Sequence, residues 1–412
     1  MGTLALALTL AIEATEVRSR AAGLVENLEA KFQPFVLNAS TCGTVADGNS
    51  DDTQALQRCI NTLPEYATLD GEGRTYLVSV LNLKSRMRLR NFRLSKFAGT
   101  ENMTSPVTLD GRTEAKTDVI VENVQVAGNR QFETNLITPS AEDGGRHCFR
   151  FVGQLNTIAL LNVNGSFCGS DGLQLGGHHA TTSDAPEALP VQNVVVRDAV
   201  FNSNRRVGIA FEGGHNLYFI NVESRFNGRK LDPAATPTQG NYCAHVDNAC
   251  FGTGVWTEND HDAAGGSFDS IYFVNLNSTA NFTRAFYAYS QSGPKVTGFR
   301  AKSNLVILES TLDAGAEPVA GNPIAIQFSS SSPDGAGAVY SGVEIGRSTI
   351  NGTVTARSLD GLLLRDSKVT ASLLGFVEYF DRIDVQNVER RGDFLSSRWL
   401  RPDGTAGAVV RY

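Results

Sequence analysis

Residues 194–221 read VVVRDAVFNSNRRVGIAFEGGHNLYFIN, and they contain the repeat from which the fold is predicted. Val194-x-Val196-x-Asp198 and Leu217-x-Phe219-x-Asn221 share one pattern, in which apolar residues alternate and an Asn or Asp follows. Alternation with a period of two is typical of β-strands. The closing Asn or Asp suits a turn, because its side chain hydrogen-bonds nearby backbone and tolerates the left-handed region. The 23 residues from Asp198 to Asn221 therefore predict one coil of a repeating structure.

The repeat extends along much of the chain and contains a second strand. The first pattern recurs at residues 119–123, 158–162 and 271–275. The second strand recurs in five segments, which are Cys148–Gly153, Gly172–Gly177, Gly208–Gly213, Gly254–Asn259 and Ala285–Ser290. No coil can bury its apolar residues alone, so stacked coils must share one continuous core. Coils without helices between their strands favour an all-β solenoid over a doubly wound sheet.

A short helix is expected at the start of the solenoid. Asp51, Asp52 and Thr53 precede an amphipathic stretch over residues 54–63, and such residues favour a helix start. This capping helix would cover the open end of the solenoid, which otherwise exposes strand edges. We expect three parts, which are an N-terminal helix over 1–36, the β-helix over 37–390 and a C-terminal tail over 391–412.

The N-terminal segment is apolar from Leu4 to Ile12, but no Lys or Arg precedes this stretch and Glu13 and Glu16 follow it. This pattern argues against a signal peptide, and the stretch is too short to span a bilayer. A heptad pattern instead predicts a helix with two apolar lines, formed by Ala7, Ala14, Ala21 and Leu28 and by Leu10, Val17 and Leu24. The apolar stripe indicates self-association or docking. The alternative is an ordinary amphipathic helix packed on its own domain.

The charge and the cysteine content limit which classes of partner and which metal or disulfide sites are expected. The 412 residues have a net charge of −7 and no basic patch, so we expect neither nucleic acid nor a membrane as a partner. The six cysteines are too few and too scattered for a disulfide scaffold, and they include no C-x-x-C pair, so no zinc site is expected. Cys243 and Cys250 are close enough in sequence to form a disulfide, although free buried cysteine is the commoner case.

Two motifs resemble those of a known superfamily. Val45-Ala46-Asp47-Gly48 followed by residues 51–56 resembles the motif that opens the β-helix of pectate-lyase-like proteins, which include many bacteriophage tailspikes and capsule depolymerases. The segments 206–214 and 254–258 are similar to two consecutive coils of those proteins. The resemblance covers about residues 40 to 300 and is more specific for fold than for chemistry. Beyond residue 300, vaguer coils such as Val343-x-Ile345 and Leu362-x-Leu364 indicate only continuity.

The resemblance implies a right-handed, single-stranded parallel β-helix that binds or degrades bacterial surface polysaccharide, capsule or lipopolysaccharide. It also implies a homotrimer on a virion tail, attached to the tail or baseplate through the N-terminal helix. A secreted bacterial protein is the alternative location. No cofactor is expected.

The register of the second strand predicts which side chains face outward. Two columns are mostly apolar and should face the core; they are Phe149, Leu173, Ile209, Val255 and Phe286, and Phe151, Leu175, Phe211, Thr257 and Ala288. The residues between them should face solvent. These outward columns are Arg150, Gln174, Ala210, Trp256 and Tyr287, and Val152, Gly176, Glu212, Glu258 and Tyr289.

Glu212 and Glu258 would therefore lie side by side, because neighbouring coils are about 4.8 Å apart. Two carboxylates that close raise the pKa of one of them, which yields the proton donor and the ionised partner needed to hydrolyse a glycosidic bond. We predict Glu258 and Glu212 as the acid and its partner, with Asp171 as the reserve carboxylate. An endo-acting glycoside hydrolase is the preferred interpretation.

Other side chains on this face predict sugar binding, since aromatic faces and polar groups suit sugar rings. The predicted substrate-binding residues are Trp256, Tyr287, Tyr289, Arg150, Arg205, Arg206 and Asp247. Alternatives remain open. Glu212 is also explained as a solvated turn residue, and Trp256 and Tyr287 as packing residues covered by an insertion or a neighbouring subunit. A calcium site from Asp247, Glu258, Asp260 and Asp262 is a further alternative, although we expect no metal.

Two competing functions use the same face. A polysaccharide lyase needs a base such as Arg or Tyr next to a uronate, and Arg205, Arg206 and Tyr289 are candidates. A receptor-binding spike without catalysis would use the groove only for attachment. The sequence does not identify the polysaccharide, because specificity depends on loop shape.

Overall fold

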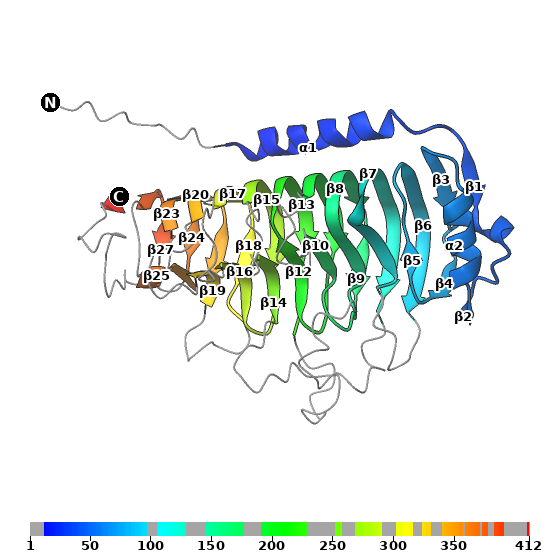
Figure 1. The fold of residues 1–412 in the computed structure, drawn as a ribbon. Coiled ribbons are helices and arrows are strands. Elements are labelled where there is room, and N and C mark those ends of the chain that lie inside the picture. Colours follow the sequence, from blue (N-terminus) through cyan, green and yellow to red (C-terminus); the bar gives the residue numbers. More distant parts are fainter. Residues whose placement is uncertain are drawn as a thin grey trace, which may run out of the picture.

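The protein is an all-β right-handed parallel β-helix with two α-helices (Figure 1). The structure is a computed structural model that describes residues 12–96, 105–128, 146–176, 191–228, 252–257, 268–290, 302–315, 324–330, 340–356, 359–370, 373–377, 383–390 and 410–411. Every strand pairing among these residues is parallel, and partners come from successive coils, as the sequence predicts.

The strands form three ladders, which we call the first, second and third sheets. The first sheet contains β1 (Val36–Asn38), β3 (Ala67–Asp70), β6 (Met87–Lys96), β7 (Val107–Ala127), β8 (Phe149–Leu161), β11 (Val191–Val200), β13 (Gly214–Glu223), β15 (Phe268–Ser278), β17 (Lys302–Leu308), β20 (Tyr340–Gly346), β23 (Leu359–Arg365), β26 (Ile383–Gln386) and β28 (Val410–Arg411). Several of these strands are long and bend from one sheet into the next.

The second sheet contains the beginnings of β7 and β8 together with β5 (Leu81–Asn82), β10 (Leu173–Gly176), β12 (Val207–Glu212), β14 (Thr253–Thr257), β16 (Arg284–Ser290), β19 (Ile324–Ser330), β22 (Thr353–Ala356) and β25 (Leu373–Val377). The third sheet contains the ends of β6, β7, β11, β13 and β15 together with β2 (Asp47–Asp51), β4 (Thr75–Val78), β9 (Asn164–Ser166), β18 (Thr311–Asp313), β21 (Thr349–Asn351), β24 (Lys368–Val369) and β27 (Glu389–Arg390).

The predicted core columns are confirmed. Leu173 pairs with Phe149 on one side and with Ile209 on the other, and the column continues through Val255 to Phe286. All five side chains are fully buried in one apolar core that extends from Leu56 near the first coil to Val385 near the last. The coils beyond residue 300 continue the same stacking, and Val343 and Ile345 pair with Leu362 and Leu364.

The Asn and Asp residues that close the first-sheet strands adopt the left-handed conformation that the sequence predicts. Asp198 and Asn221 have φ angles of 56° and 55°. The side chains also form a ladder along the surface, in which Asn221 Nδ2 donates to Asp198 Oδ1 at 2.8 Å and Asn275 donates to Asn221 at 3.0 Å. A second, buried ladder of Asn204, Asn227 and Asn281 was not predicted.

Helix α2 (Thr53–Thr62) covers the open end of the first coil, as predicted, and buries Leu56 and Ile60 in the core. The buried carboxylate of Asp52 accepts hydrogen bonds from the backbone N–H groups of Val45 and Ala46, at 2.7 and 3.0 Å. The segment that resembles the opening motif of pectate-lyase-like proteins is therefore a structural element that fixes the start of the β-helix.

Helix α1 (Ala14–Glu29) lies along the outside of the first sheet (Figure 1). Its buried residues are Ala14, Val17, Ala21, Val25 and Leu28, and they pack on outward side chains that include Ile120, Val195, Tyr218, Tyr272 and Val306. The apolar stripe thus contacts its own domain, so the packing alternative replaces self-association as the explanation of this stripe. Leu24 lies at its edge, and Ala7 and Leu10 lie outside the described residues.

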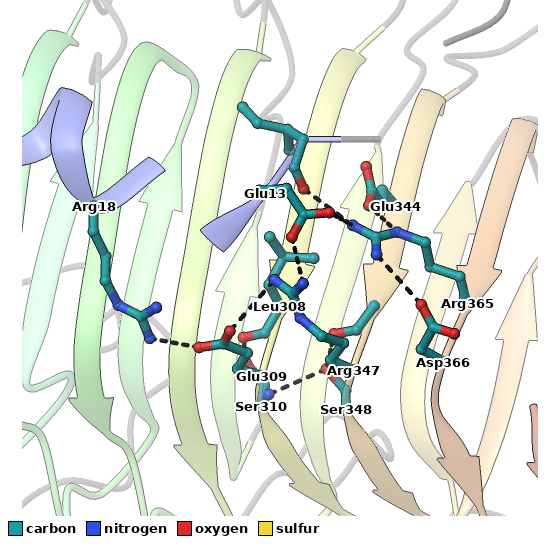
Figure 2. Close-up of polar contacts among 12 residues, drawn as sticks. Glu13, Arg18, Leu308, Glu309, Ser310, Glu344, Arg347, Ser348, Arg365 and Asp366 are labelled. Atoms are coloured by element: carbon teal, nitrogen blue, oxygen red, sulfur yellow. Dashed lines mark hydrogen bonds and ion pairs between the residues drawn. The ribbon is translucent and has the colours of Figure 1, made fainter. Parts of the chain in front are cut away.

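Charged residues fix the N-terminal end of α1 on the later coils (Figure 2). Glu13 forms ion pairs with Arg347 and Arg365, and Arg18 pairs with Glu309. At the other end of the helix, Arg88 of β6 lies 3.8 Å from Glu29. The helix therefore connects early coils to late ones. Among the described residues, neither helix has the length and apolar sequence that crossing a membrane requires.

Two disulfides join cysteines that the sequence analysis did not pair. Cys42 and Cys59 join the 3₁₀ turn at Ala39–Cys42 to α2, and Cys148 and Cys168 lie within the core. The partners are 17 and 20 residues apart in sequence. They meet because the coil brings these positions together, which scattered spacing does not reveal. Cys243 and Cys250 lie outside the described residues.

Candidate functional site

The outward face of the second sheet is the candidate site, and its first column has the predicted register. Gln174 pairs with Arg150 and Ala210, and the column continues through Trp256 to Tyr287. In the second column, Gly176 pairs with Val152 and Glu212. The observed pairing of β12 with β14 extends to Phe211 and Thr257, one residue before Glu258. Glu258 and Asp247 themselves lie outside the described residues.

Glu212 is a half-buried carboxylate in contact with the preceding strand. Gln174 Nε2 donates to Glu212 Oε1 at 3.5 Å. A Cβ atom at Gly176 would lie only 2.7 Å from the Cβ of Glu212, so the neighbouring position must lack a side chain. The glycine therefore keeps the flank of this carboxylate clear.

Arg150 lies next to this carboxylate in a group of charges. Burial lowers the pKa of Arg150, as does the nearby Arg112, while Asp110 and Glu212 act in the opposite direction. Arg112 is itself engaged with Asp110, since its Nη2 and Nε atoms lie 2.5 and 3.0 Å from that carboxylate. Arg150 is thus a partly desolvated cation placed between two acidic groups on the outward face.

Trp256 points outward as predicted but is not exposed. Only 4% of its surface is accessible, because it packs with Val207 and Ala210 in a small apolar cluster outside the sheet. The guanidinium group of Arg206 lies 4.8 Å from the centre of its ring. The prediction of a solvent-exposed indole is therefore wrong, and the packing alternative describes this residue.

Tyr287 is half-buried beside that cluster, and the guanidinium group of Arg284 lies 4.2 Å from its ring centre. The backbone of Tyr289 pairs with Ser329, and its side chain lies outside the described part of the chain. Arg205 is half-buried in the turn before β12, where its N–H donates to Cys168 O at 3.0 Å. A sugar-binding role for these three residues stays a prediction.

Asp171 is a structural carboxylate rather than a reserve catalytic group. It is fully buried, and Arg206 holds both oxygens at 2.9 Å. Burial raises the pKa of Asp171, but Arg206 and His147 together outweigh burial and lower this pKa overall. A buried, ionised carboxylate held in this way neither reaches a glycosidic oxygen nor donates a proton to it.

The sequence analysis missed His147 and Arg284, which lie at the outward corner where the second sheet begins. His147 is buried, with its Nδ1 atom 3.1 Å from Asp171 Oδ2, and burial lowers its pKa. At this corner, the regular alternation of inward-facing and outward-facing residues shifts by one position. Counting every second residue back from the strand therefore assigns His147 and Arg284 to the core. Within the described part of the chain, no cluster of three His, Cys, Asp or Glu residues suits a metal ion. The calcium alternative involves residues outside that part.

Comparison with known proteins establishes the fold and leaves the activity open. No family model and no curated protein matches the chain. Among solved structures, the chain is similar to PfbA, a surface adhesin of Streptococcus pneumoniae, with a TM-score of 0.52 and 13% identity over 88% of this chain and 93% of that one.

Two further structures are similar at the same level. The A-module of the mannuronan C-5 epimerase AlgE4 from Azotobacter vinelandii has a TM-score of 0.51 and 11% identity over 91% of this chain and 100% of that one. The N-terminal fragment of gene product 12 from bacteriophage Phi29 has a TM-score of 0.52 and 12% identity over 96% and 68%. With the parallel ladders and the stacked core, these similarities show that the chain has the right-handed parallel β-helix fold.

Proposed function

We propose that this protein binds a bacterial surface polysaccharide on the outward face of the second sheet and cleaves it within the chain by hydrolysis. The observation that supports this best is the placement of Glu212, with Gln174 and Arg150, on adjacent outward strands. Successive strands are about 4.8 Å apart and repeat along an extended face. Such a face suits a long polymer better than a compact ligand.

Glu258 is the proposed second carboxylate. The described register pairs Phe211 with Thr257, and in the sequence a glutamate follows each of these residues. A pair on adjacent strands would share charge repulsion that raises the pKa of one member, which then acts as the acid. A separation of about 5 to 5.5 Å suits retention of configuration, and about 6.5 to 9.5 Å suits inversion. Asp171 has no part in this scheme, because it is buried and paired with Arg206.

A lyase is the second candidate, and Arg150 is the observation that favours it. Its pKa is lowered by burial and by Arg112, and a base for proton abstraction next to a uronate needs such a shift. Attachment without cleavage is the third candidate, favoured by the fold that the chain shares with a surface adhesin. A virion-tail location and a homotrimer are part of the proposal, and the fold shared with a phage protein supports the location.

The test is to incubate the full chain with capsule and lipopolysaccharide from a panel of bacteria. Hydrolysis predicts shorter products with new reducing ends and no new ultraviolet absorbance. An unsaturated, ultraviolet-absorbing product would show that the polymer is cleaved by elimination rather than by hydrolysis. Tight binding with no change in polymer size across every binding polysaccharide would favour the attachment role. Sedimentation equilibrium of the same sample tests the trimer.

A further inference from the structure

Arg284 at the start of β16 differs from other buried arginines of the protein. Only 9% of its surface is accessible, and its Nε atom has no hydrogen-bond partner. Among the described residues, its side chain contacts the ring of Tyr287, whose centre lies 4.2 Å from the guanidinium carbon. Within the described part of the chain, no carboxylate lies within ion-pair distance of it.

Two other arginines show what a compensated guanidinium looks like in this fold. Arg206 lies over Trp256 in a similar way, but both oxygens of Asp171 accept its hydrogen bonds at 2.9 Å. Arg365 is equally buried and donates to Glu344 at 2.8 Å. Arg284 thus packs against an aromatic ring, as Arg206 does. Unlike Arg206 and Arg365, it has no carboxylate partner among the described residues.

A buried cation is stable only when an anion or several acceptors offset its desolvation. Arg284 lies in register with Thr253, whose hydroxyl contacts that of Thr283 at 3.1 Å, and both of these neighbouring groups are neutral. A planar guanidinium group with five donors matches a carboxylate, which it binds through two parallel hydrogen bonds. A carboxylate is therefore the ligand that best matches Arg284.

We infer that Arg284 and Tyr287 form a subsite for the carboxylate of an acidic sugar in the polysaccharide. This inference rests on the proposed function, since it assigns a substrate class to the same outward face. Arg284 and Glu212 belong to strands β16 and β12, which are separated by one intervening strand. The two positions are thus about 10 Å apart along the axis, and Arg284 is level with Val207, which lies five residues, or about 17 Å, before Glu212 along the strand. The acidic sugar therefore binds away from the bond that reacts rather than at it.

Binding of matched glycans tests the subsite. The probes are polygalacturonate, alginate, hyaluronate and acidic capsules, each with its carboxyl-reduced, neutral form. The wild-type protein should bind at least one acidic form ten-fold or more tightly than its reduced form. Arg284→Gln should remove that preference and leave the affinity for the reduced form unchanged. Arg93→Gln, at an exposed position on β6, is the matched control and should keep the preference.

Thermal unfolding without glycan gives a second readout. Because Arg284 has no anion to lose, Arg284→Gln should melt at the same temperature as the wild type or higher. A lower melting temperature for this variant than for Arg93→Gln would show a structural cation and overturn the subsite.

The outcomes separate this inference from the proposed function. Cleavage of a glycan with equal affinity for its acidic and reduced forms overturns the subsite and leaves the proposed hydrolysis standing. An acid preference that depends on Arg284, without cleavage, supports the subsite and contradicts hydrolysis. A protein that binds none of these glycans contradicts both.

Discussion

Arg206 binds both carboxylate oxygens of Asp171 at 2.9 Å and at the same time covers the ring of Trp256. This relationship joins three residues that the sequence analysis assigned to separate roles in catalysis and sugar binding. Asp171 orients the guanidinium group, and the guanidinium group covers the indole. The three side chains thus form one packed group at the second sheet.

Replacing Asp171 by Asn should destabilise the fold strongly. The change leaves Arg206 partly buried without its anion, and breaking a buried pair in this way costs about 3–5 kcal/mol of the free energy of unfolding. Urea unfolding measures this. The control is Glu65→Gln, which removes the exposed pair with Arg86 and should cost about 0–1 kcal/mol. Equal effects of the two changes would contradict the structural role of Asp171.

The stability of the protein should decrease as the pH falls below about 6.5. Burial lowers the pKa of His147 in the folded state, so the unfolded chain binds a proton more readily. The stabilisation is complete above the unfolded pKa and is lost as the pH falls toward the folded pKa. Asp171, whose folded pKa is also lowered, adds a loss only below about pH 4. Melting temperatures measured from pH 5 to 8 check this prediction. His147→Gln should make the melting temperature depend less on pH. An unchanged pH dependence in this variant would show that His147 is not the cause.

Replacing Glu258 by Gln should abolish depolymerisation while folding and sugar binding persist, because the amide cannot donate the proton. Glu212→Gln should lower the rate by about 100-fold or more, the usual contribution of a positioned acid or base. Reducing-end release measures both rates. Glu114→Gln, at an exposed position on β7, is the control and should retain full activity. Full activity of Glu258→Gln or Glu212→Gln would show that the carboxylate assignment is wrong.

Replacing Ala21 by Glu should release α1 from the first sheet. Ala21 is buried against the outward residues of that sheet, and the change places an unpaired charge in an apolar contact. We expect a loss of about 1–3 kcal/mol in the free energy of unfolding, and faster proteolysis within residues 12–32. Ser19→Glu on the exposed side of the helix should have neither effect. Equal protease resistance of both variants would contradict the docking of α1.

Much of the fold was predictable from particular residues. The alternation at Val194, Val196 and Asp198 gave the strands and the left-handed turns, and the spacing of Ile209 and Val255 gave the register that the structure confirms. These features depend on local chemistry and on a repeat. Predicting these features does not require knowing which side chains or segments cover the outside of the sheets.

The rest depends on contacts that a period of two does not encode. Alternation shows that Trp256 points away from the core, but its burial depends on Val207, Ala210 and Arg206. The pairing of Asp171 with Arg206 joins residues 35 apart that flank a corner. The heptad pattern of α1 predicted an apolar stripe without identifying the surface that it packs on.

The direction of α1 also has a consequence for synthesis. The ribosome makes Glu13 before the strands that the structure describes, yet the partners of Glu13 are Arg347 and Arg365, more than 300 residues later. Each coil can stack as soon as it emerges, whereas the helix completes these ion pairs only after Arg365 has been translated. The N-terminal end of the helix therefore attaches after the coils that precede Arg365 have been made.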